Sequence, residues 1–139
     1  MTESAQNSGS LRVIQSAAAI IVGIEALAVL AFAVFGLVTD LLPGNAKSLP
    51  AAVTMIVLYF AAGAWVAYIA YSLAKSKRWA RSGAIFWQTC QLALASQSFT
   101  GRGASVLIGV ALIVPSVAVL ALMFTKPVLA ANKKEILGE

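Results

Sequence analysis

The chain has 139 residues, of which 60% are hydrophobic and only 11% are charged, and its formal net charge is +5. A soluble domain of this size needs more charge to cover its surface, so the composition indicates that lipid is the solvent for most side chains. With no His and a single Cys, Cys90, the chain has neither an internal disulfide nor a Cys/His metal site, and we expect no cofactor.

Four apolar stretches follow one another, over residues 13–38, 51–74, 79–99 and 103–125. Each reaches or approaches the ~20 residues that a spanning helix needs, although the third is shorter and more polar than the others. The connections between them are short enough to be hairpin turns, and lipid-embedded segments must be helical to satisfy their backbone. The sequence therefore predicts an all-α membrane protein. It would be a single domain over residues 1–139, a four-helix transmembrane bundle with polar tails at 1–10 and 127–139.

The Lys and Arg residues predict the orientation of this bundle. One side collects eight of the ten, namely Arg12, Lys75, Lys77, Arg78, Arg81, Lys126, Lys133 and Lys134. The other side has only Lys47 and Arg102. Because cytoplasmic loops carry the excess of positive charge, we expect a plasma (inner) membrane protein with both termini in the cytoplasm.

The same cations suggest a partner. The cluster formed by Lys75, Lys77, Arg78 and Arg81 is a candidate contact for anionic lipid headgroups, although such a loop is more often only a topology anchor. Since the positive charge lies at the ends of apolar stretches, nucleic acid is not an expected partner.

Glu25 is the only charge within residues 13–38. A carboxyl group at membrane depth costs roughly 2.5 kcal/mol or more, so it needs either a packing partner or a function. The third stretch offers amide partners, because Gln88 and Gln91 share one helical face with Arg81, and amides do not point at lipid. Further members of this face are Ala84, Ala95 and Ser98.

Helix geometry places these groups at similar depths. Glu25 lies ~20 Å along the axis beyond Arg12, and Gln91 lies ~15 Å beyond Arg81. We therefore predict that Glu25 hydrogen-bonds to the face carrying Gln88 and Gln91, or to Tyr59 in the second stretch. Whether this acid is structural or is a proton site stays open at this point.

The chain shows no pair of buried carboxylates, no His to act as a base and no Gly-rich phosphate loop after a strand, so we expect no catalytic residues and no enzyme activity. The leading hypothesis is a non-catalytic accessory or scaffold subunit that packs against itself or a larger membrane complex. The alternative is a proton-coupled small-molecule transporter or conductance centred on Glu25.

Two sequence motifs resemble a known group of proteins. They are Gly23-Ile24-Glu25-Ala26-Leu27-Ala28, and Lys77-Arg78-Trp79-Ala80-Arg81 followed by Trp87-Gln88 and Gln91-Leu92. Similar motifs recur in uncharacterised small four-span membrane proteins of actinobacteria. This resemblance implies an actinobacterial plasma membrane and a four-helix fold, but no activity.

The small multidrug resistance transporters provide an analogy for the acid. They also have four spans and a single buried Glu in the first helix, which exchanges protons for a cationic drug within a dimer. Glu25 would take that role here. This chain is longer and lacks the aromatic and glycine pattern of that family, so the analogy concerns the chemistry of the site alone.

Overall fold

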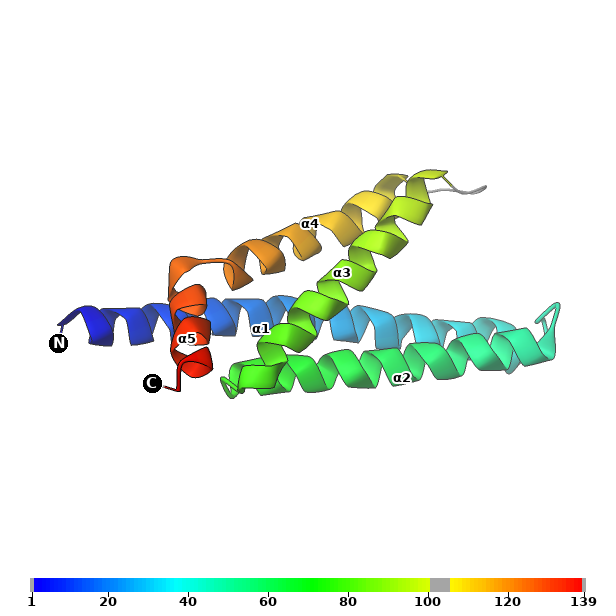
Figure 1. Cartoon of the computed structure of the whole chain (residues 1–139). Coiled ribbons are helices and arrows are strands. Elements are labelled where there is room, and N and C mark those ends of the chain that lie inside the picture. The colour runs from blue at the N-terminus through cyan, green and yellow to red at the C-terminus, as the bar shows by residue number, and fades with distance from the viewer. Residues whose placement is uncertain (1, 101–105, 139) are drawn as a thin grey trace.

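The computed structural model describes residues 2–100 and 106–138, and these residues form helices joined by short turns (Figure 1). In chain order the elements are α1 (Thr2–Gly36), a π-helical turn η1 (Leu37–Leu41), α2 (Leu49–Ala74), α3 (Arg78–Thr100), α4 (Val106–Met123) and α5 (Lys126–Ile136). Three segments are long and apolar enough to cross a membrane, namely Ser8–Leu41, Leu49–Ala74 and Val106–Met123. The described residues confirm the prediction of an all-helical chain with helices long and apolar enough to span a membrane.

The helix ends follow from local sequence chemistry. Pro50 lies in the first turn of α2, where its missing N–H is not needed, and Ser48 precedes the helix in an extended conformation. The turn between η1 and α2 contains Gly44 with φ +72°, a left-handed conformation that suits glycine. The turn between α2 and α3 is shorter, and Ser76 adopts the left-handed conformation there with φ 57°.

Helix boundaries agree with the predicted stretches except at the two ends of the chain. The helix that contains the first stretch already begins at Thr2, so the segment predicted as a polar tail is mostly helical. The second tail contains α5. Hydropathy marks where a helix meets lipid, not where it begins, so polar residues extend α1 without a break. Residues 103–105 of the fourth predicted stretch, with Arg102, lie outside the described residues.

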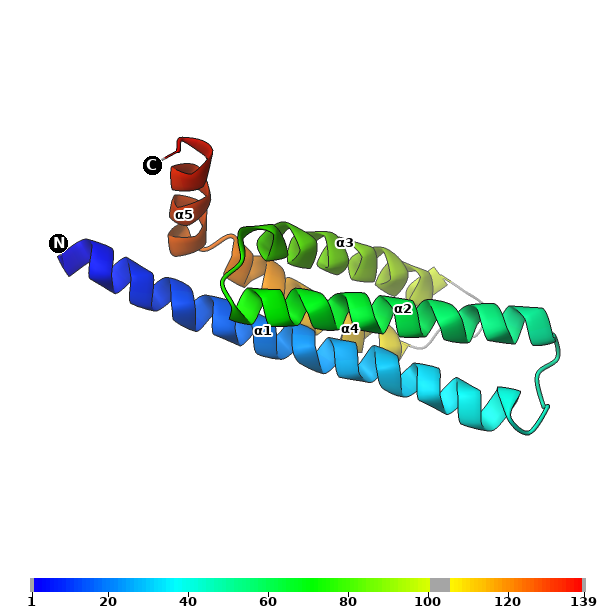
Figure 2. The same cartoon turned by 90° about the horizontal axis from the view of Figure 1, so that it is seen from below.

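Helices α1 and α2 form a long antiparallel hairpin that is held together by small residues (Figures 1 and 2). A Cβ atom at Gly63 would lie 2.6 Å from the side chain of Leu30, and one at Gly23 would lie 3.9 Å from the Cβ of Ala70. Small residues let backbones approach closely, which is how helices associate in lipid. These contacts set the register of the hairpin.

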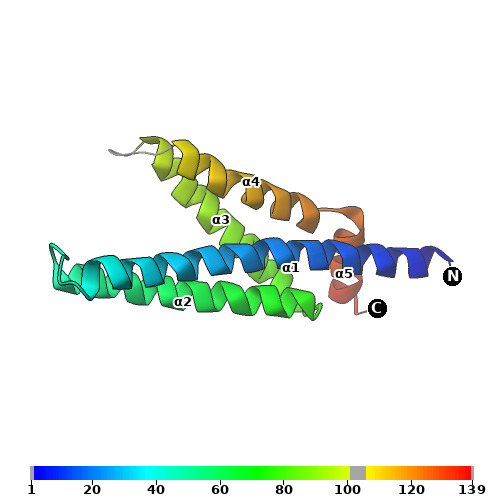
Figure 3. The same ribbon diagram turned by 180° about the vertical axis from the view of Figure 1, so that it is seen from behind.

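Helices α3 and α4 form a second hairpin that crosses the first. The two hairpins are packed together near the turn between α2 and α3, and they diverge from there, as the front and back views agree (Figures 1 and 3). The far half of α1–α2, toward the turn at residues 42–48, is therefore not covered by α3 and α4.

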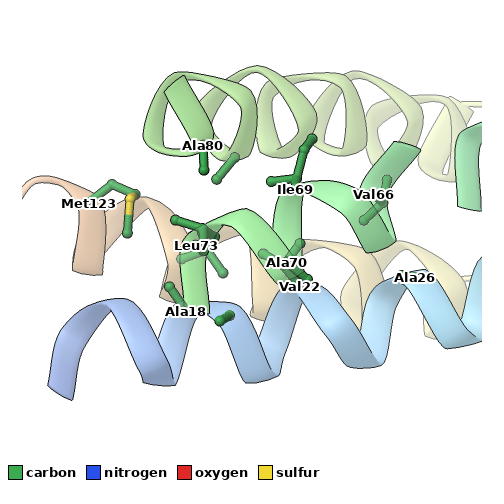
Figure 4. Packing of buried hydrophobic residues seen from close by; sticks show 12 residues of the cluster. Ala18, Val22, Ala26, Val66, Ile69, Ala70, Leu73, Ala80 and Met123 are labelled. Atoms are coloured by element: carbon green, nitrogen blue, oxygen red, sulfur yellow. The ribbon is translucent and has the colours of Figure 1, made fainter. Parts of the chain in front are cut away.

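The hydrophobic core lies where the hairpins cross. Figure 4 shows Ile69 and Leu73 of α2 between Ala80 of α3 and the α1 residues Ala18 and Val22. Many of the core side chains are alanines, which permits close helix packing. Helix α5 runs transverse to α1 beside this crossing (Figures 1 and 2), and its Val128 is fully buried.

Candidate functional site

Polar side chains are buried in the interior of the bundle, and several of them come from α3. The buried polar residues are Gln15, Glu25, Ser72, Arg81, Gln88, Gln91 and Ser116. On α3 the buried positions are Ala80, Arg81, Ala84, Gln88, Gln91 and Ala95, so the polar face predicted for the third stretch does turn inward. Phe86 and Leu94 of the same helix are exposed on the outside.

Glu25 lies at the centre of this polar interior and is only 7% exposed. Its Oε2 atom accepts a hydrogen bond from Nε2 of Gln88 at 2.9 Å and another from Nε1 of Trp87 at 3.1 Å. Both donors belong to α3, whereas the carboxyl belongs to α1. The predicted hydrogen bond between Glu25 and the glutamine face is confirmed for Gln88, and it fastens the two hairpins to each other.

The indole N–H of Trp87 is a partner that the sequence reasoning missed. Trp87 is adjacent to Gln88 in sequence and therefore lies about 100° from it around the helix, at the edge of the polar face. A tryptophan is largely apolar and carries one donor, which needs a partner when buried. The adjacent pair Trp87-Gln88 is the sequence signal for this donor, because a tryptophan next to an inward-facing glutamine places its indole N–H at the edge of the polar face.

Gln91 joins α3 to α4. Its Oε1 atom accepts a hydrogen bond from the hydroxyl of Ser116 at 2.7 Å, and that hydroxyl lies equally close, 2.7 Å, to the carbonyl oxygen of Leu112. Both Gln91 and Ser116 are buried. The polar face of α3 thus bonds to α1 through Gln88 and to α4 through Gln91.

Several buried polar atoms of this interior have no hydrogen-bond partner within the described protein. They are Oε1 of Glu25, Oε1 of Gln88, both amide atoms of Gln15 and the hydroxyl of Ser72. Gln15 and Glu25 lie on the same helix, and Gln88 touches Glu25. Unused hydrogen-bonding capacity therefore remains on the carboxyl group itself and on the glutamine that binds it.

The prediction that Tyr59 belongs to the polar interior is wrong. Tyr59 is 43% exposed and lines a shallow pocket in the far half of the α1–α2 hairpin. Gly23 of α1 faces Ala70 of α2, and the two helices are antiparallel, so Glu25 lies at the depth of the residues just before Ala70. Tyr59 lies at least ~10 Å from that depth along the α2 axis, toward the N-terminus of α2. Its direction around α2 fits the interior, but its depth does not.

The predicted headgroup cluster is divided by the structure. Lys75, Lys77 and Arg78 are exposed, as a lipid contact requires. Arg81 is only 5% exposed, and its Nη1 atom donates a hydrogen bond to Oδ1 of Asn132 in α5 at 2.6 Å. The assignment of Arg81 as a headgroup contact is therefore wrong, because α5 packs over it.

Aromatic side chains surround the exposed part of this cluster. The Trp79 ring lies 5.1 Å from the Tyr68 ring and 6.1 Å from the Trp65 ring, between centroids. The ammonium group of Lys77 lies 6.0 Å from the Tyr68 ring. Amphipathic rings and cations gather at a membrane–water interface, so this end of the bundle has the chemistry of one.

Within the described residues, no group of three His, Cys, Asp or Glu side chains is placed to hold a metal ion. No protein-family model matches the sequence, and no curated protein or solved structure shows significant similarity to it. The site is therefore interpreted from its own geometry.

Proposed function

We propose that this chain is a multi-pass plasma-membrane protein with four spans and both termini in the cytoplasm. Three apolar helices support the membrane location. The case for α3 as the fourth span is its 23-residue length together with its two faces. It turns its glutamines inward and Phe86 and Leu94 outward, as a helix with lipid on one side does.

Within that membrane, we propose that the protein is a non-catalytic accessory or scaffold subunit, which packs against itself or a larger complex. The observation that carries this proposal is that the interior polar side chains form hydrogen bonds between helices and do not line the pocket in the far half of the α1–α2 hairpin. Gln88 bonds to Glu25 and Ser116 bonds to Gln91, and each of these bonds joins two helices. The pocket at the far end is lined by other residues.

The far half of the α1–α2 hairpin offers a surface for such packing. It exposes Phe32, Phe35 and Met55, and the pocket there also contains Gly36 and Ala51. Small residues beside large apolar ones permit close approach of a neighbouring helix. A second copy or another membrane subunit would bind along this half, which α3 and α4 leave uncovered.

Purification from native membranes in mild detergent tests this proposal. We expect the chain to migrate as an oligomer or with a co-purifying membrane protein, and Ala51→Trp to abolish the association by filling the pocket. Ala93→Trp, at an exposed position on α3, is the matched control and should leave the association intact. A bare monomer for the unmodified chain would refute the proposal.

A proton-coupled transporter or conductance is the second candidate, favoured by the unpartnered Oε1 atoms of Glu25 and Gln88. Oε1 of Glu25 is free to take up a proton, and Oε1 of Gln88 is a free acceptor on the residue that binds Glu25. In this case, Glu25→Gln would abolish proton flux in liposomes while the fold stayed intact. Unchanged flux in this variant, measured beside the unmodified chain, would eliminate the candidate.

A further inference from the structure

We propose that α5 is an interfacial helix that binds the anionic surface of the membrane. This inference rests on the proposed membrane-spanning arrangement, but not on the presence of any protein partner. It begins from the position of α5, whose axis runs transverse to α1 in two perpendicular views (Figures 1 and 2). If α1 crosses a bilayer, α5 lies along the bilayer surface.

One side of α5 is fixed to the bundle. Val128 is fully buried, and Asn132, one helical turn further on, accepts the 2.6 Å hydrogen bond from the buried Arg81. A hydrogen bond from a guanidinium is charge-assisted and therefore stronger than one between neutral groups. These two contacts determine the rotation of α5 about its own axis.

With that rotation fixed, a second side of α5 is apolar and exposed. Leu129 and Ile136 are 46% and 84% exposed, and they lie seven residues apart, two turns along the same face. Leu129 follows Val128, so this face lies about 100° around the helix from the buried side. An exposed apolar face on a transverse helix is what an interfacial helix inserts among acyl chains.

The cations complete the amphipathic pattern. Lys126, Lys133 and Lys134 of α5 are exposed. The hydrogen bond between Asn132 and Arg81 holds α5 beside the first turn of α3, which begins at Arg78. The exposed Lys75 and Lys77 precede that helix by a few residues. The α5 cations therefore lie at the same end of the bundle as the exposed part of the α2–α3 cluster. Anionic headgroups are the complementary partner, and each cation near such a surface raises binding on the order of fivefold.

The position of α5 can be measured with spin labels on the full-length chain in nanodiscs. In a Cys90→Ala background, labels at Ile136→Cys and Lys134→Cys report accessibility to oxygen and to a water-soluble nickel complex. We expect Ile136 to be oxygen-accessible and Lys134 nickel-accessible in discs containing phosphatidylglycerol. Phe86→Cys, on the outer face of α3, is the control for embedding. If Ile136 is nickel-accessible while Phe86 remains oxygen-accessible, the α5 proposal fails and the spanning arrangement stands.

The dependence on lipid charge is tested by amide hydrogen exchange. We expect α5 to exchange at least fivefold more slowly in phosphatidylglycerol discs than in pure phosphatidylcholine discs. The double variant Lys133→Gln with Lys134→Gln should lose this difference, and Lys47→Gln, at the opposite end, should keep it. Equal exchange in the two lipids for the unmodified chain, or an unchanged difference in the double variant, would overturn the proposal.

Discussion

Replacement of Glu25 tests how the polar interior contributes to stability. Glu25→Gln keeps an oxygen of the same shape that can accept from both Nε2 of Gln88 and Nε1 of Trp87. Glu25→Leu removes that acceptor and leaves the buried amide of Gln88 and the partly buried indole N–H of Trp87 without a partner. Interhelical hydrogen bonds in membranes contribute ~0.6 kcal/mol on average and up to ~1.7 kcal/mol. We therefore expect Glu25→Leu to cost about 1–3 kcal/mol of unfolding free energy, and Glu25→Gln to stay within about 0.5 kcal/mol of the unmodified chain.

The assay is equilibrium unfolding in mixed micelles, followed by tryptophan fluorescence and by steric trapping as an independent probe. The single variant Gln88→Leu and the double variant Glu25→Leu with Gln88→Leu complete a double-mutant cycle. We expect an interaction free energy of about 0.6–1.7 kcal/mol between the two positions. The reasoning is refuted if Glu25→Leu is as stable as the unmodified chain, or if the glutamine variant loses as much stability as the leucine variant.

Further predictions concern the two close helix contacts. Gly63→Ala should cost about 1–3 kcal/mol, because the new Cβ would lie 2.6 Å from the side chain of Leu30, whereas Gly23→Ala, at 3.9 Å from its nearest neighbour, should be tolerated. Equal unfolding free energies for the two variants would contradict this. Gly109→Ala should loosen α3 from α4, since its Cβ would lie 2.6 Å from the Phe99 ring, and amide exchange should rise in those two helices and not in α1. Unchanged exchange in α3 and α4 would contradict this second expectation.

The sequence predicted the helices and the inward face of α3 because both depend on local periodicity. Apolar length marks a helix in lipid, and the spacing of Gln88 and Gln91 places them on one side of it. The depth comparison with Glu25 used only the axial rise of a helix, and that was sufficient to predict the bond to Gln88.

The errors came from tertiary packing that no local pattern contains. Tyr59 points in the right direction around α2, but the diverging hairpins leave its end of α2 uncovered. Arg81 looked like part of an exposed basic loop, and it is buried because α5 returns over it. The transverse position of α5 depends on the hydrogen bond between Arg81 and Asn132. These residues are 51 positions apart, so the periodicity within a single helix cannot predict the contact.

The most direct test of the central claim is to determine on which side of the membrane the α2–α3 turn and the C-terminal segment lie. Single cysteines at Ser76 and Leu137, in the Cys90→Ala background, are labelled with a membrane-impermeant maleimide in intact cells and in inverted vesicles. If α3 crosses the bilayer with its glutamines turned toward Glu25, both positions react from the cytoplasmic side, while a cysteine at Lys47 reacts from the outside. Labelling of Ser76 and Leu137 from opposite sides would mean that α3 does not span the membrane, and the account would be wrong.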